Sequence, residues 1–145
     1  MMPAAIRFAI TIVHQSMASS SHVAMMAMSP MKRSGTAKAR FHSSGTTGLP
    51  KPIVHGHGGI LLEHLKVLAL HNDLGPADRF FWFSTTGWMM WNYQVSGLAV
   101  GATIVLFDGS PGHPDLGALW RLTADEGVTF FGTSAPFLMA CRKEG

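Results

Sequence analysis

The 145-residue sequence has little of what stabilises small secreted domains or spans membranes. Its single cysteine, Cys141, excludes an internal disulfide and weakly favours a reducing compartment. No stretch reaches eighteen apolar residues, so the sequence predicts no transmembrane helix. Charged residues make up only 13% of the chain and hydrophobic residues 47%, so we expect a well-buried core together with some exposed apolar surface.

Acidic residues are absent from residues 1–40, which carry five basic residues, whereas residues 41–145 carry six basic and eight acidic residues. No helical or strand period persists in this amino-terminal segment. Three interpretations stay open: a mitochondrial transit peptide, a weak secretory core at residues 8–13, and translation outside the proper frame. A nucleic-acid-binding role has less support, because no aromatic residues interleave with the basic ones.

We therefore expect the chain to consist of two parts. Residues 1–42 are expected to be unrelated to the remainder of the chain, and either disordered or out of frame. Residues 43–145 are expected to form part of one domain. The cytoplasm is the expected compartment, and the basic amino-terminal segment makes the mitochondrion the alternative.

The most informative segment is residues 43–51, Ser-Ser-Gly-Thr-Thr-Gly-Leu-Pro-Lys. Gly45 and Gly48 let the backbone approach a ligand closely, while hydroxyl and amide groups supply neutral hydrogen-bond donors. Lys51 adds a cation, and Pro50 stiffens the exit from the segment. These features predict a phosphate-binding loop. It is not a Walker A loop, because its glycine and lysine spacing differs from that motif.

Residues 44–51 match Ser-Gly-Thr-Thr-Gly-x-Pro-Lys at every position, and so resemble the phosphate loop of adenylate-forming enzymes, the group that includes acyl-CoA synthetases, luciferases and peptide-synthetase adenylation domains. The resemblance implies that this loop binds the β- and γ-phosphates of ATP. The residues implied in nucleotide binding are Ser44, Gly45, Thr46, Thr47, Gly48 and Lys51.

Helical and strand patterns alternate after the loop, which predicts an α/β fold with a parallel sheet and flanking helices. The predicted helices cover residues 58–71, 90–100, 114–126 and 135–142, and the predicted strands cover 79–84, 103–107 and 128–131. In the first helix, Leu61, Leu62, Leu65 and Leu68 belong to the predicted apolar face, with Glu63 and His64 on the opposite face. Gly101 is expected to end the second helix.

A second segment joins an aromatic strand to a Ser/Thr/Gly loop and then to Trp88, Met89 and Met90. Ligands of α/β folds usually bind at the carboxyl ends of the strands, where this segment is expected. Considered alone, these side chains are more simply explained as part of a hydrophobic core, because aromatic residues are usually buried. In the acyl-CoA synthetases that this sequence resembles, a Gly-Trp pair begins the acyl-binding region, and Gly87-Trp88 matches that pair. The resemblance implies that Trp88, Met89 and Met90 bind the acid substrate.

Within that family, residues 52–59, 87–93 and 131–136 most resemble the acetoacetyl-CoA synthetase branch. The resemblance implies a piece of the large amino-terminal domain of an adenylate-forming enzyme. Such an enzyme joins a carboxylate to the α-phosphate of ATP, with Mg²⁺, and then transfers the acyl group to coenzyme A. His55 is more simply explained as structural, and His55 with His57 is too small a set for zinc.

The sequence contains no aromatic-Gly-x-Thr-Glu segment, which in the family binds adenine and holds magnesium. The ribose-binding aspartate and the catalytic lysine are also expected outside this chain, so we assign no catalytic residue within it. Two hypotheses stay open: an acyl-CoA ligase fragment that is inactive alone, and a non-catalytic nucleotide- or phosphate-binding module.

Overall fold

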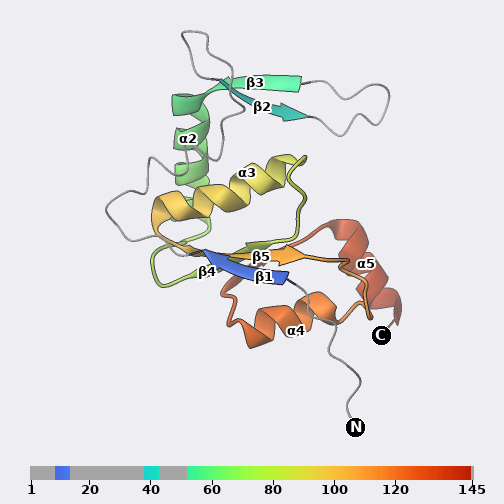
Figure 1. Ribbon diagram of the computed structural model, residues 1–145. Helices are drawn as coiled ribbons and strands as arrows, with labels where there is room; N and C mark the ends of the chain where they lie inside the picture. The colour runs from blue at the N-terminus through green and yellow to red at the C-terminus, as the bar shows by residue number, and fades with distance from the viewer. Residues whose placement is uncertain (1–8, 14–37, 43–51, 145) are drawn as a thin grey trace.

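A computed structural model describes residues 9–13, 38–42 and 52–144, with side chains described from residue 53 onward (Figure 1). Its main sheet has four strands in the order β1 (Ala9–Val13), β5 (Thr103–Asp108), β4 (Arg79–Trp82) and β6 (Phe130–Gly132). Strand β4 pairs parallel with both β5 and β6, whereas β1 pairs antiparallel with β5. The predicted α/β fold with a parallel sheet is therefore confirmed.

The central strands bury side chains on both faces of the sheet. Successive side chains of a strand point to opposite faces, so Phe80 and Phe81 of β4 enter different hydrophobic clusters. Ile104 and Val105 of β5 divide in the same way. This pattern is typical of parallel strands that are covered on both faces.

Helices cover both faces (Figure 1). On one face lie α2 (His57–Leu65), which continues as the π-helix Lys66–His71, and α3 (Met89–Ser96), which continues as the 3₁₀-helix Gly97–Val100. On the other lie α4 (Ala118–Asp125) and α5 (Ala135–Glu144). The four predicted helices are thus present, and Gly101 ends the second in the left-handed conformation with φ of 84°.

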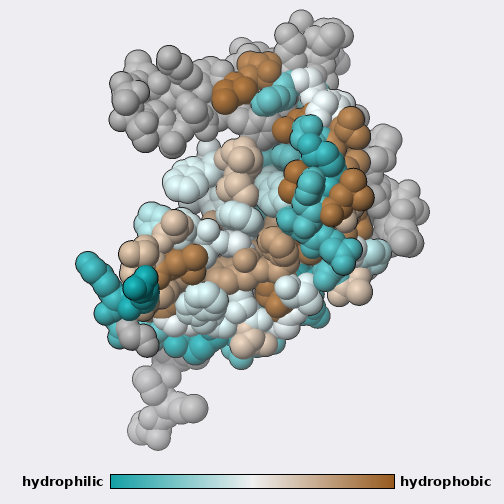
Figure 2. All heavy atoms as spheres, turned by 180° about the vertical axis from the view of Figure 1, so that it is seen from behind, coloured by the Kyte–Doolittle hydropathy of each residue, from teal (hydrophilic) through white to brown (hydrophobic). Residues whose placement is uncertain are grey.

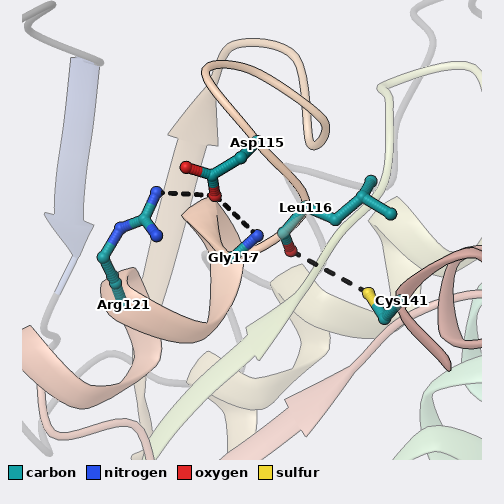
Figure 3. Close-up of polar contacts among 5 residues, drawn as sticks. All are labelled: Asp115, Leu116, Gly117, Arg121 and Cys141. Atoms are coloured by element: carbon teal, nitrogen blue, oxygen red, sulfur yellow. Dashed lines mark hydrogen bonds and ion pairs between the residues drawn. The ribbon is translucent and has the colours of Figure 1, made fainter. Parts of the chain in front are cut away.

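Helix α4 begins at Ala118, so the predicted start near residue 114 was wrong. The Asp115 carboxylate accepts hydrogen bonds from the Gly117 N–H at 2.8 Å and from Arg121 Nη2 at 2.9 Å (Figure 3). An aspartate side chain that bonds the backbone two residues on favours a turn over a helix. Residues 114–117 therefore form the turn that leads into α4.

Two described strands lie in the segment that we expected to be disordered or out of frame. Strand β1 pairs along its whole length with β5, and β2 (Lys38–His42) pairs antiparallel with β3 (Pro52–Gly56). The structure thus describes ten residues of this segment as strand, and the expectation that the segment is unrelated to the remainder of the chain stays a prediction. The Ile-Thr-Ile-Val run of β1 has high β-propensity and covers an edge that β5 would otherwise expose. The proposed boundary at residue 42 stays a prediction.

Large hydrophobic side chains are exposed over several elements, as the composition predicts. On the face shown in Figure 2, hydrophobic and hydrophilic residues lie side by side over α2. The most exposed of these hydrophobic residues in the described part of the chain are Leu70 at 78% and Leu62 at 69%. An exposed ion pair, Glu63 with Lys66, lies on the same helix.

Gly132 provides a first test of the packing around β4. A Cβ atom at this position would lie 1.9 Å from Cε3 of Trp82, because the indole ring lies against the glycine backbone. We expect Gly132→Ala to lower the free energy of unfolding by about 1–3 kcal/mol through overpacking. Urea denaturation measures this change in the free energy of unfolding. Gly75→Ala is the control, since nothing lies within 4 Å of its Cβ; equal effects of the two changes would contradict the prediction.

Candidate functional site

The nucleotide-binding residues predicted from the sequence lie outside the described residues, so their roles stay predictions. The flanking residues are described: His42, at the end of β2, is the register partner of Pro52, at the start of β3. The two residues that flank segment 43–51 are therefore held next to each other by a strand pair. Strand β3, which the sequence analysis did not predict, then leads directly into α2.

The predicted acid-binding residues lie together where α3 begins, beyond the carboxyl end of β4. Trp88 is the N-cap residue of α3 and is 62% exposed, and Met89 is 44% exposed. Met90 is half-buried and packs against the core cluster that contains Phe80 and Tyr93. These three residues, here called the acid turn after their predicted role, lie in the segment that joins the carboxyl end of β4 to α3, and the role itself stays a prediction.

Backbone hydrogen bonds hold the acid turn. The Trp88 N–H donates to the Thr85 carbonyl at 3.0 Å, and the Trp91 N–H donates to the Trp88 carbonyl at 3.1 Å. Among the described side chains, none caps the amino terminus of α3 with a hydrogen bond. The turn therefore combines apolar side chains with uncapped helical amides, which together suit a small molecule with an apolar body and an anionic end.

The second half of α3 is buried and makes polar contacts that the sequence analysis did not predict. His64 of α2, 6% exposed, lies with Nδ1 at 2.7 Å from Oγ of Ser96, which is fully buried. The Ser96 hydroxyl donates to the Asn92 carbonyl at 2.8 Å. Because the hydroxyl hydrogen is directed to Asn92, the His64 ring nitrogen acts as the donor to Ser96.

The predicted polar face of α2 was therefore wrong at His64. His64 lies one helical turn before the fully buried Leu68, and residues four apart share a helix face. Leu62, by contrast, is 69% exposed, although the sequence analysis assigned it to the apolar face. A pattern of apolar residues alone therefore predicts the wrong buried face for α2, because the face that is actually buried includes a histidine.

Tyr93 and Gln94 fix α3 to two further elements. The Tyr93 hydroxyl accepts a hydrogen bond from Asn72, which follows the π-helix. Its ring makes edge-to-face contacts with His64, Phe80 and Trp82, at centroid distances of 5.5–5.8 Å. Burial raises the pKa of Tyr93, an effect that the Asn72 hydrogen bond opposes. Gln94 donates through Nε2 to the Val105 carbonyl of β5.

The described residues contain no group of three His, Cys, Asp or Glu side chains that could hold a metal ion. His55 is exposed, and Nε2 of His57 is buried with no hydrogen-bond partner among the described atoms. None of the helices in the described part of the chain is long and apolar enough to cross a membrane.

Comparisons with known proteins agree with this architecture. Residues 15–145 match the family model of the AMP-binding enzymes. The acetoacetyl-coenzyme A synthetase of Rhizobium meliloti is 55% identical over 103 residues, covering 71% of this chain and 16% of that protein. The acetoacetyl-CoA synthetase of Danio rerio is 52% identical over 97 residues, covering 67% of this chain and 14% of that protein.

A solved structure, that of the acetoacetyl-CoA synthetase from Streptomyces lividans, matches with a TM-score of 0.67 and 65% sequence identity, over 73% of this chain and 16% of that one. The chain belongs to the AMP-binding enzyme family. It spans about one sixth of the length of the Rhizobium and Streptomyces proteins, 16% in each case.

The buried histidine makes the stability of the fold depend on pH. Burial lowers the pKa of His64 below its usual value of 6.5, so the unfolded chain binds a proton at this residue more readily than the folded chain. The contribution of the neutral, buried His64 to the stability of the fold is fully present above pH 6.5. It is lost as the pH falls through the pKa that His64 has in the folded state.

We expect the free energy of unfolding, measured with urea, to fall between pH 7.5 and pH 5, and to fall less in His64→Gln. His113→Gln is the control because it also removes one imidazole, but from an exposed position. An identical pH dependence in wild type and His64→Gln would contradict this assignment.

Proposed function

We propose that this chain is the phosphate- and acid-binding part of an ATP-dependent acid–thiol ligase that activates acetoacetate. In the proposed reaction, a carboxylate oxygen attacks the α-phosphorus of ATP and pyrophosphate leaves; the coenzyme A thiol then attacks the acyl carbon and AMP leaves. The eight-residue match of residues 44–51 to the family's phosphate loop carries this proposal. Membership of the AMP-binding enzymes and the synthetase relatives support it.

The nucleotide end of the site is assigned to the phosphate loop. In this proposal, amides of Gly45 and Gly48 and the neighbouring hydroxyls donate hydrogen bonds to the β- and γ-phosphates. Lys51 offsets their negative charge as pyrophosphate departs. Support comes from the strand pair β2–β3, because register pairing of His42 with Pro52 fixes both ends of the segment that carries these groups.

The acid end is assigned to the acid turn. Acetoacetate has a short carbon chain and one carboxylate, and the turn offers the exposed apolar side chains of Trp88 and Met89 beside the uncapped first turn of α3. Apolar contacts would exclude water from the reacting carboxylate, which strengthens electrostatic interactions there. We name acetoacetate rather than another short acid because all three synthetases described above carry it in their names.

Mg²⁺ and coenzyme A are the remaining components of the proposed reaction. The family resemblance places the magnesium-binding glutamate outside this sequence, so no step is assigned to the ion on this chain. The cytoplasm stays the expected compartment, with the mitochondrion as the alternative.

Lys51 provides the direct test of nucleotide binding. ATP at about ten times its Kd is expected to stabilise the chain by about 1.4 kcal/mol, because only the folded state binds it. Lys51→Ala should abolish this stabilisation. Lys143→Ala, which removes an exposed lysine from the last turn of α5, should retain it. Thermal unfolding with and without ATP measures the stabilisation in each variant. Equal stabilisation by ATP in the two variants would refute the role of Lys51.

The isolated 145-residue chain is expected to show no acetoacetate-dependent exchange between ATP and pyrophosphate. The electrostatic groups that stabilise the transition state, the magnesium-binding glutamate and a second lysine, are expected outside this sequence. An isotope-exchange assay with labelled pyrophosphate checks this. A clear exchange signal would mean that the residues of this chain suffice for adenylation.

A further inference from the structure

Four polar residues in the described part of the chain are buried: His64, Gln94, Ser96 and Thr103. Two of them, His64 and Ser96, hydrogen-bond each other across the interface between α2 and α3. A buried hydrogen-bonded pair adds little net stability compared with a well-packed apolar pair, but it permits far fewer arrangements of the two helices. The pair is thus better suited to fixing an orientation than to holding the fold together.

The orientation it fixes is that of the helix carrying the acid turn. Helix α3 is anchored at its carboxyl-terminal half, where Tyr93, Gln94 and Ser96 are buried, while Trp88 and Met89 at its other end are exposed. Met90 precedes Ser96 by six residues, or about 9 Å along the axis. A tilt of about 10° at Ser96 would therefore displace Met90 by roughly 1.5 Å.

We propose that His64 and Ser96 are positioning residues, whose hydrogen bond sets the orientation of α3 and thereby holds Trp88, Met89 and Met90 in the geometry that accepts the carboxylate substrate. This inference rests on the proposed function for its ligand, but not for the positioning itself. Because His64 belongs to the helix entered from β3, the contact also ties the acid turn to the element that follows the phosphate loop. A misplacement of about 1 Å at a reacting group can cost a factor of about 100 in rate.

The experiment uses the 145-residue chain labelled with ¹³C at its methionine methyl groups and ¹⁵N at its indole N–H groups. NMR spectra report the surroundings of Trp88, Met89 and Met90 without ligand, and a titration with acetoacetate reports affinity. Ser96→Ala should displace all three signals and raise the Kd for acetoacetate about tenfold. His64→Asn should stay close to wild type, because its side-chain amide can place a donor near the position of Nδ1.

Thr123→Val is the matched control. The Thr123 hydroxyl donates to the Trp120 carbonyl at 2.7 Å within α4, just as Ser96 donates within α3, but α4 covers the opposite face of the sheet. This variant should leave the three signals and the affinity unchanged. If Ser96→Ala does not fold, His64→Phe breaks the same hydrogen bond while keeping a ring of similar size in place.

The outcomes separate this inference from the proposed function. If the signals move in Ser96→Ala but wild type does not bind acetoacetate, the positioning role stands and the proposed substrate is wrong. If the signals stay in place, the inference is overturned, even where unfolding shows lower stability. It is also overturned if the signals move while a wild-type affinity for acetoacetate is retained.

Discussion

Aromatic side chains on the central strand β4 limit how closely the neighbouring elements can approach the sheet. This strand lies between β5 and β6, and its two phenylalanines belong to the cores on opposite sides of the sheet. Large rings on a central strand leave little room for their neighbours. A Cβ atom at Gly97 would lie 2.7 Å from Cδ1 of Phe80, so the glycine allows the 3₁₀-helix to approach the sheet. The bulk of β4 therefore requires glycine at the two positions that approach it most closely, Gly97 and Gly132.

Polar contacts then select one arrangement among those that hydrophobic packing allows. Apolar burial is non-directional, so the cluster around Phe80 would tolerate several orientations of α3. The hydrogen bonds of Ser96, Tyr93 and Gln94 reach α2, the end of the π-helix and β5, respectively. Three bonds to three separate elements leave few orientations for the helix that carries the acid turn.

The element order could be predicted from the sequence because it depends on local pattern. Alternating helical and strand periods placed β4, β5 and β6 and all four helices, and the Ser/Thr/Gly loop after the aromatic strand placed Trp88, Met89 and Met90 beyond the carboxyl end of β4. Strands β1 and β3 could not be found in the same way. Strand β1 is short, and its pairing partner β5 lies about ninety residues further along the chain, so its stability comes from a non-local contact.

The inner face of α2 illustrates a different limit. Its buried row contains His64, and a histidine counts as polar in any hydrophobic pattern. Only the position of Ser96 on another helix makes that burial favourable, because a buried polar group needs a partner. Pattern reasoning identifies the helix itself and its approximate ends, whereas the side that faces inward is set by tertiary contacts. The phosphate loop remains a prediction from its residues.

The π-helix Lys66–His71 has a consequence for the spacing of this chain. The Asn72 N–H bonds to the Val67 carbonyl, five residues back, so this segment holds more residues per turn than an α-helix does. Removing one residue here would let ordinary α-helical geometry return with the same carbonyl partner, because a bond to the residue five back becomes a bond to the residue four back. Asn72 would then keep its direction toward the Tyr93 hydroxyl that it contacts. The π-helix therefore accommodates one residue more than an α-helix would between these two contacts, without changing the direction in which Asn72 leaves the helix.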